Sequence, residues 1–219
     1  MRIVNEHFLG PMLLQASVPY EFCDKLVEYG NNSTRDHRAK LAGEINKEIG
    51  FKDEYQEHIH TSIFPLINEY IIRLMLRSNT SYLLEKYNIE FSDSWINYQQ
   101  AYEYNPLHTH SGDISYVIYC DIPECIEKEE QITNGTPPGC INFRRGTAPH
   151  SRDGLERISN IFQDRMGLVH IPRKGDMFIF PASLEHSVTR FLSPNATRIS
   201  VSGNCYVRGE IDGKKPYKG

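Results

Sequence analysis

Two histidines stand two residues apart after an aromatic-rich segment, and a third histidine follows far downstream. His108 and His110 lie in the segment YNPLHTH, and His186 ends the segment FPASLEH. Side chains two residues apart on a β-strand point to the same face. If the first segment is a strand, both imidazoles can therefore bind one metal ion, and His186 can supply a ligand from a later strand. Imidazoles on one side of a metal with open positions opposite are typical of non-haem iron(II) sites.

Asp113 is a fourth candidate ligand. The turn at Ser111-Gly112 could bring its carboxylate back toward the histidines, or Asp113 could simply begin the next strand. Two ligand sets therefore stay open: both His108 and His110, or one of them paired with Asp113. Because residues i and i+2 of a strand share a face, the set with both histidines is favoured.

A second pair of histidines with the same spacing provides an internal comparison. His58 and His60 lie in a segment with helical periodicity. Residues two apart on an α-helix point about 200° apart around the axis, so this pair is not expected to share a metal.

Arg198 is the residue that could bind an anion beside such a metal. It begins a run in which Arg198, Ser200, Ser202 and Asn204 would share one face of a strand. A buried guanidinium needs an anionic partner, and a dicarboxylate co-substrate would fit, with Ser200 as an additional donor. The alternative is a solvent-facing polar stripe, and spacing alone leaves both interpretations open.

The elements that must position these residues change character near residue 91. Before it, the sequence predicts an extended stretch over Ile3–Ala16, a helix after Pro19 and a longer helix over Ile59–Leu74, which Pro65 would kink or begin. After it, short β-rich runs are separated by Gly, Pro and Asn, which indicates a mainly β sandwich or jelly roll. We expect a single domain (1–219) with a helical N-terminal support region (1–90), a β core (91–208) and a frayed tail (209–219).

Composition excludes several classes of protein. The chain has 219 residues and a net charge of −4, which argues against broad binding to nucleic acid. No segment is apolar enough to cross a membrane, and the polar N-terminus does not resemble a signal peptide. The five cysteines are scattered and include no CxxC pair, which favours a reducing, cytoplasmic compartment.

Three motifs in order resemble those of the iron(II)/2-oxoglutarate oxygenases found in marine phages and bacteria. They are HTHSGDISYVIY at 108–119, FPASLEHSV at 180–188 and RISVSGN at 198–204. The match spans about Trp95–Asn204. A phage-encoded chain would act in the host cytoplasm.

The resemblance implies a double-stranded β-helix (jelly roll, cupin-like) and an Fe(II)/2-oxoglutarate-dependent hydroxylase. Its cofactors would be Fe(II), 2-oxoglutarate and O2, and its co-products succinate and CO2. His186 would be the distal iron ligand, and Arg198 would bind the far carboxylate of 2-oxoglutarate with help from Ser200. The wider superfamily has His-x-Asp or His-x-Glu where this chain has His108 and His110. Tyr116 and Asn142 are further candidate contacts to the co-substrate. The candidate catalytic residues are thus His108, His186 and Arg198.

Two other functions stay open at this point. One is a cupin-like metalloenzyme with three histidines and no 2-oxoglutarate, in which Arg198 would have no role. The other is a non-catalytic β-sandwich binding module. The expected substrate is a peptide or small molecule that the sequence does not identify, and a homodimer is an option because such sheets often pair.

Overall fold

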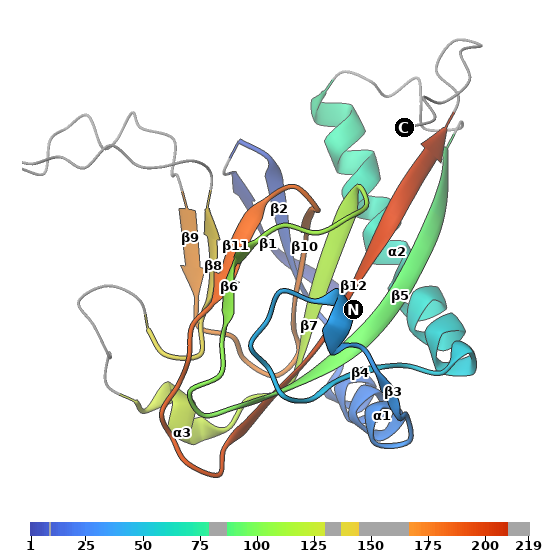
Figure 1. Ribbon diagram of the computed structural model, residues 1–219. Helices are drawn as coiled ribbons and strands as arrows, with labels where there is room; N and C mark the ends of the chain where they lie inside the picture. Colours follow the sequence, from blue (N-terminus) through green and yellow to red (C-terminus); the bar gives the residue numbers. More distant parts are fainter. Residues whose placement is uncertain (9, 79–86, 130–136, 145–166, 210–219) are drawn as a thin grey trace, which may run out of the picture.

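Two β-sheets face each other, and two helices cover the outer face of the larger one (Figure 1). This computed structural model describes residues 1–8, 10–78, 87–129, 137–144 and 167–209. The strand order of the large sheet is β1-β2-β10-β7-β12-β5-β4-β3, and that of the small sheet is β6-β11-β8-β9. All pairings between these strands are antiparallel. The predicted mainly β jelly roll is confirmed.

The large sheet consists of β1 (Arg2–Phe8), β2 (Met12–Ser17), β3 (Arg35–Asp36), β4 (Glu48–Gly50), β5 (Tyr87–Gln100), β7 (Ile114–Asp121), β10 (Asp176–Pro181) and β12 (Thr197–Gly209). The small sheet consists of β6 (Asn105–His108), β8 (Ile141–Arg144), β9 (Gly167–His170) and β11 (Glu185–Val188). The helices are α1 (Tyr20–Asn31), α2 (Asp53–Arg77) and α3 (Glu124–Glu127), with a 3-10 turn at Arg38–Lys40.

The N-terminal region differs from the expectation of a helical support. It holds the predicted helices α1 and α2, but it also contributes the strands β1 to β4 to the large sheet. The extended stretch predicted over Ile3–Ala16 is the hairpin of β1 and β2. Pro65 lies inside α2, so it does not begin that helix. The tail residues 210–219 lie outside the described residues.

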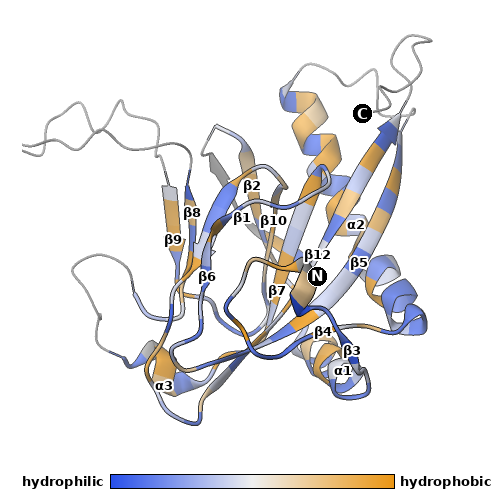
Figure 2. Cartoon of the chain, viewed as in Figure 1, coloured by the Kyte–Doolittle hydropathy of each residue, from blue (hydrophilic) through white to orange (hydrophobic). Residues whose placement is uncertain are grey.

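Alternation along the strands separates two apolar cores. On β7, Ile114, Ile118 and Cys120 pack toward α1 and α2, whereas Val117 and Tyr119 pack toward the small sheet. This is the period of two expected for a strand buried on both faces. Figure 2 shows the same alternation of hydrophobic and hydrophilic residues along the long strands. The site described below lies between the two sheets.

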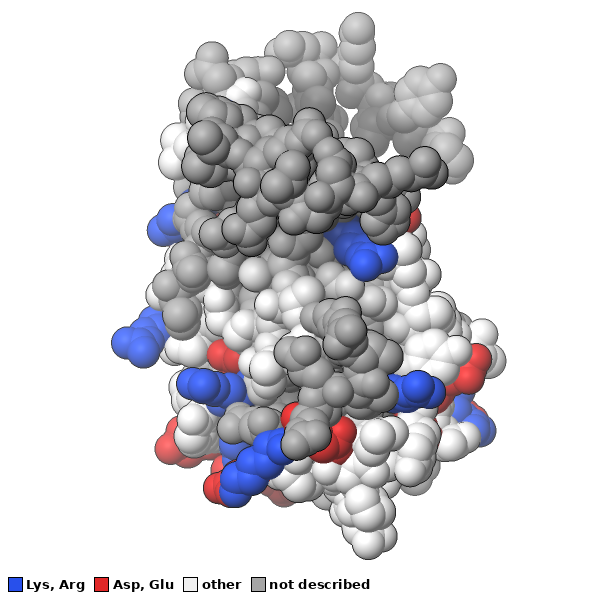
Figure 3. Space-filling view, turned by 90° about the vertical axis from the view of Figure 1, so that its left-hand side faces the viewer, with Lys and Arg blue, Asp and Glu red and all other residues white. Residues whose placement is uncertain are grey.

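None of the described helices is long and apolar enough to cross a membrane. On the face shown in Figure 3, the described Lys and Arg side chains are interspersed with Asp and Glu and do not form a continuous basic band.

Candidate functional site

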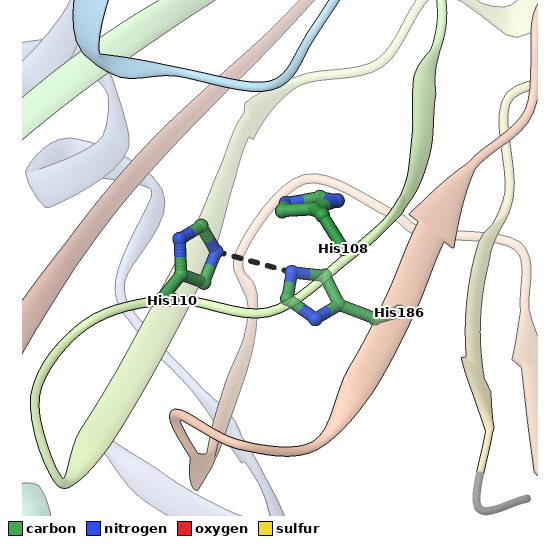
Figure 4. A group of neighbouring side chains, drawn as sticks. All are labelled: His108, His110 and His186. Carbon is green, nitrogen blue, oxygen red and sulfur yellow. Dashed lines mark hydrogen bonds between the residues drawn. The ribbon is translucent and has the colours of Figure 1, made fainter.

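Three histidines converge between the sheets (Figure 4). His108 is the last residue of β6, and His186 lies opposite it on the neighbouring strand β11. His110 follows in the loop after β6, where its backbone N–H donates to the Ala182 carbonyl oxygen at 2.9 Å. This bond holds the loop against the residues that precede β11, so a residue outside a strand still reaches the group.

The spacing of the ring nitrogens fits a single metal ion. The potential ligand atoms of the three histidines all lie within 4.8 Å of one another. Nε2 of His110 and Nε2 of His186 are 3.1 Å apart. Two nitrogens about 2.1 Å from one metal and at right angles to each other would be separated by about 3.0 Å. The group therefore has the dimensions of one face of a coordination shell.

Backbone carbonyls fix the tautomers of two of the rings. Nδ1 of His108 is 2.7 Å from the Pro106 oxygen, and Nδ1 of His186 is 2.9 Å from the Leu184 oxygen. Because a carbonyl oxygen only accepts, each Nδ1 carries the proton, and each Nε2 lone pair is directed away from it. Outer hydrogen bonds of this kind orient histidine ligands in metal sites.

Burial keeps the three imidazoles neutral. It lowers the pKa of His110 to about 4 and that of His186 to about 3, with the neighbouring His108 adding to both shifts. Burial also lowers the pKa of His108. Phe180 lies 4.9 Å from the His186 ring, between centroids, and contributes to this dry surrounding. At neutral pH the rings are therefore available as metal ligands without loss of a proton from an imidazolium.

The histidines border a cavity of about 550 Å³ between the sheets. The predicted polar face of β12 lines it, with Arg198, Ser200, Ser202 and Asn204 directed inward. Ile199 and Val201 point to the core on the helix side. Of the two interpretations of this stripe, the inward one is therefore correct.

Arg198 is fully enclosed and only partly paired. Its side chain is 2% exposed, its guanidinium lies 4.9 Å over the Tyr119 ring, and one of its terminal nitrogens donates to Gln99 Oε1 at 2.7 Å. Its Nε and the Tyr119 hydroxyl have no hydrogen-bond partner. Burial lowers the pKa of Arg198 from its ordinary value. Unpaired buried donors beside a cation are costly unless an anion binds there, so this corner of the cavity fits a carboxylate.

Asp113 does not join the histidine group. Its Oδ2 accepts the backbone N–H of Val207 at 2.8 Å, and its own N–H donates to the Cys205 oxygen at 3.0 Å. The carboxylate thus joins the start of β7 to β12 at the far side of the Ser111-Gly112 turn. The interpretation of Asp113 as a turn residue is the one that the geometry supports.

The two further candidate contacts to the co-substrate, Tyr116 and Asn142, do not face the cavity with their side chains as expected. Tyr116 borders the cavity, but its ring packs in the core on the helix side, and its hydroxyl is 2.5 Å from Ser94 Oγ. Asn142 lies between Ile141 and Phe143, whose side chains fill the core between the sheets, so strand alternation turns Asn142 to the other face.

Sequence reasoning missed the partners of Arg198. Tyr119 is three residues from Tyr116 on the same strand, so alternation alone places the two rings on opposite faces of β7. Gln99 lies directly opposite Arg198 in the register of β5 and β12. Only that register, which the sequence does not show, could have identified Gln99.

The chain matches one family model over residues 93–204, and its description is "Putative 2OG-Fe(II) oxygenase". This segment contains all three histidines and Arg198. A search of curated proteins finds no match.

Solved structures share the fold at low sequence identity. The chain is 13% identical to the α-ketoglutarate-dependent carbocyclase SnoK of nogalamycin biosynthesis, with a TM-score of 0.53 over 94% of this chain and 89% of that one. The epimerase SnoN, solved with Fe3+, α-ketoglutarate and nogalamycin RO, is 13% identical with a TM-score of 0.51 over 94% and 86%. A prolyl-4-hydroxylase from Pseudomonas putida is 12% identical, with a TM-score of 0.49 over 90% and 93%.

Proposed function

The chain belongs to the family of 2-oxoglutarate/iron(II) oxygenases, and from this premise we propose that it hydroxylates a C–H bond of a peptide or small molecule. In that reaction one oxygen atom of O2 enters the substrate, and the other enters succinate as 2-oxoglutarate loses CO2. The observation that carries the proposal is the pairing, in one cavity, of three convergent imidazoles with a buried guanidinium that lacks an anion.

His108, His110 and His186 would hold the iron. When bound, iron(II) with 2-oxoglutarate supplies the oxygen activation that attacks an unactivated C–H bond. The carbonyls of Pro106 and Leu184 keep two of the rings oriented before the metal arrives. His186 Nε2 accepts a hydrogen bond from His110 Nε2, so His110 would offer the same nitrogen to a metal only in the tautomer that carries its proton on Nδ1.

Arg198 and Tyr119 would bind the far carboxylate of 2-oxoglutarate. The free Nε–H of Arg198 and the Tyr119 hydroxyl can both donate to it, and bonds to a charged acceptor are stronger than neutral ones. Gln99 holds the guanidinium in place. Ser200, whose neighbours on the sheet are Asn97 and Tyr119, lies beside this corner and can add a hydroxyl donor.

The apolar wall of the cavity would exclude water from the reaction. Ile141, Phe180 and Val188 line it next to the histidines. Water exclusion strengthens the electrostatic interactions inside a site and limits side reactions. The cupin-like alternative without 2-oxoglutarate leaves the buried Arg198 without an anion, so it explains less of the cavity.

Anaerobic titration of the full chain with iron(II) and then 2-oxoglutarate tests the proposal through the visible charge-transfer band of the chelate. We expect the band in the wild type and its loss in His186→Ala. His58→Ala is the matched control, because it removes an imidazole of the other HxH pair, which lies on α2. Iron binding without a band in the wild type would favour the cupin-like enzyme, and no iron binding would exclude both.

A further inference from the structure

A row of polar side chains crosses the large sheet on its cavity side. Glu48 on β4 lies opposite Asn97 on β5, Asn97 lies opposite Ser200 on β12, and Ser200 lies opposite Tyr119 on β7. All four residues line the cavity. Neighbouring strands are about 4.8 Å apart, so about 14 Å separates the two ends of the row. This length leaves room for a second ligand group beyond the carboxylate corner.

Three acceptor atoms near the Glu48 end of the row lack partners. Glu48 Oε2, Asn97 Oδ1 and Asn105 Oδ1 are buried atoms without a hydrogen-bond partner. The Glu48 side chain is 1% exposed and that of Asn97 is 5% exposed. Leaving a buried acceptor unpaired is costly, and three of them together indicate a missing donor.

The orientation of the Asn97 amide is fixed by its other bonds. Its Nδ2 lies 3.4 Å from the Ser200 backbone oxygen, which can only accept. The nitrogen therefore belongs on the Ser200 side, and Oδ1 is the atom left free.

Gly43 lies against both the Asn105 amide oxygen and the Glu48 carboxyl group, which it approaches at Oε1. A Cβ atom at Gly43 would collide with Asn105 Oδ1 and would lie 3.4 Å from Glu48 Oε1. The missing side chain of the glycine thus leaves room for a carboxyl group and an amide oxygen next to each other. Both side chains belong to the cavity wall.

The ionisable side chain at this end is a carboxyl group. Among the described residues that line the cavity, Arg198 is the one Lys or Arg, and it lies at the other end of the row, where it donates to Gln99. The other acidic lining residue, Asp93, is paired with Arg35 at 3.2 Å. Burial, with the charge of Glu103 as the second cause, raises the pKa of Glu48 to about 7. The charge of Arg38 lowers the pKa of Glu48 and offsets these two effects only in part.

We propose that Glu48, Asn97 and Asn105 form a subsite for a cationic N–H donor, an ammonium or guanidinium group of the substrate. This inference rests on the proposed function and names its substrate class. Three free acceptors match the N–H groups of such a cation, and the Glu48 carboxylate supplies the charge that a neutral donor would not need. The substrate would then lie between this subsite and the histidines, with a C–H bond near the metal.

Trp95 provides a direct readout of binding. It is the one tryptophan of the chain, is 5% exposed and lines the cavity. Its fluorescence in the full chain, with iron(II) and 2-oxoglutarate under anaerobic conditions, would be titrated with Nα-acetyl-lysine amide and Nα-acetyl-arginine amide. The neutral probes of similar shape are Nα-acetyl-norleucine amide and Nα-acetyl-citrulline amide.

We expect at least one cationic probe to bind at least tenfold more tightly than its neutral counterpart. Glu48→Gln should abolish most of that preference, whereas Asp93→Asn, which removes an ion-paired carboxylate from the same cavity, should retain it. Asn105→Asp should strengthen binding of the cation severalfold, and it serves as the second variant if Glu48→Gln does not fold. Equal affinity for both kinds of probe, no binding of either, or equal losses in Glu48→Gln and Asp93→Asn would each overturn the proposal.

The outcome can be separated from that of the proposed function. A chelate band without a preference for cationic probes would overturn the subsite alone. The opposite result is a protein that shows no chelate band but prefers cationic probes, with the preference lost in Glu48→Gln. It would overturn the oxygenase proposal alone.

Discussion

Replacing Arg198 by methionine should separate binding of 2-oxoglutarate from stability of the fold. Arg198 is 2% exposed, and its Nε has no protein partner. We therefore expect the guanidinium to contribute mainly to the binding free energy of 2-oxoglutarate. Removing one partner of a buried, hydrogen-bonded charge pair costs about 2–5 kcal/mol. That range corresponds to a loss of about 30-fold to 4000-fold in affinity for 2-oxoglutarate.

The same change should alter the stability of the ligand-free protein little. Methionine removes the cost of burying an unpaired charge, but it also leaves Gln99 Oε1 without its donor. Each effect is about 1–3 kcal/mol and the two have opposite signs, so we expect the free energy of unfolding to stay within about 1 kcal/mol of wild type.

Anaerobic calorimetric titration with 2-oxoglutarate and urea unfolding of the ligand-free protein measure the two quantities. Arg208→Met is the matched control, since Arg208 lies on the same strand but is exposed and paired with Glu90 at 3.3 Å. Affinity of Arg198→Met within threefold of wild type would refute the assigned carboxylate corner. A loss of more than about 2 kcal/mol in unfolding free energy would show that Arg198 is mainly a structural residue.

Three further outcomes are expected. Tyr119→Phe should weaken 2-oxoglutarate binding by about 1 kcal/mol, or about fivefold, in the same titration, because it removes one donor; unchanged binding would exclude the hydroxyl. The raised pKa of Glu48 means that its contribution to stability is complete below pH about 4.3 and is lost as the pH rises through about 7. Urea unfolding should therefore show a decline over this range that is weaker in Glu48→Gln, and identical profiles would contradict the shift. Gly203→Ala should destabilise the protein by about 1–3 kcal/mol, because its Cβ would collide with the Tyr116 hydroxyl. Thermal unfolding measures this effect, and a melting temperature equal to that of the wild type would argue against a rigid core around Tyr116.

The sequence predicted the chemistry better than the arrangement of the strands. The grouping of His108, His110 and His186 was predicted correctly, but the assumption that His108 and His110 share a strand was wrong, because β6 ends at His108 and His110 lies in the next loop. The rule for helices correctly set aside His58 and His60, which lie on α2. The β-rich character after residue 91 was visible in the composition and turn residues of the short runs. The roles of these histidines as iron ligands remain a proposal.

Only the tertiary structure decided which face of each strand lines the cavity and which residues lie opposite each other on neighbouring strands. Alternation says that Arg198 and Ser200 share a face, but whether that face meets water or the cavity depends on the small sheet that packs over it. The contribution of β1 to β4 to the large sheet depended on partners far along the chain, as β2 pairs with β10 and β4 with β5. Gln99 and Glu48 could be assigned to the site only from the residues opposite them on neighbouring strands, which are Arg198 and Asn97. Local sequence thus determined which side chains could do chemistry, whereas long-range pairing decided which of them meet, because hydrogen bonds between strands carry no sequence code of their own.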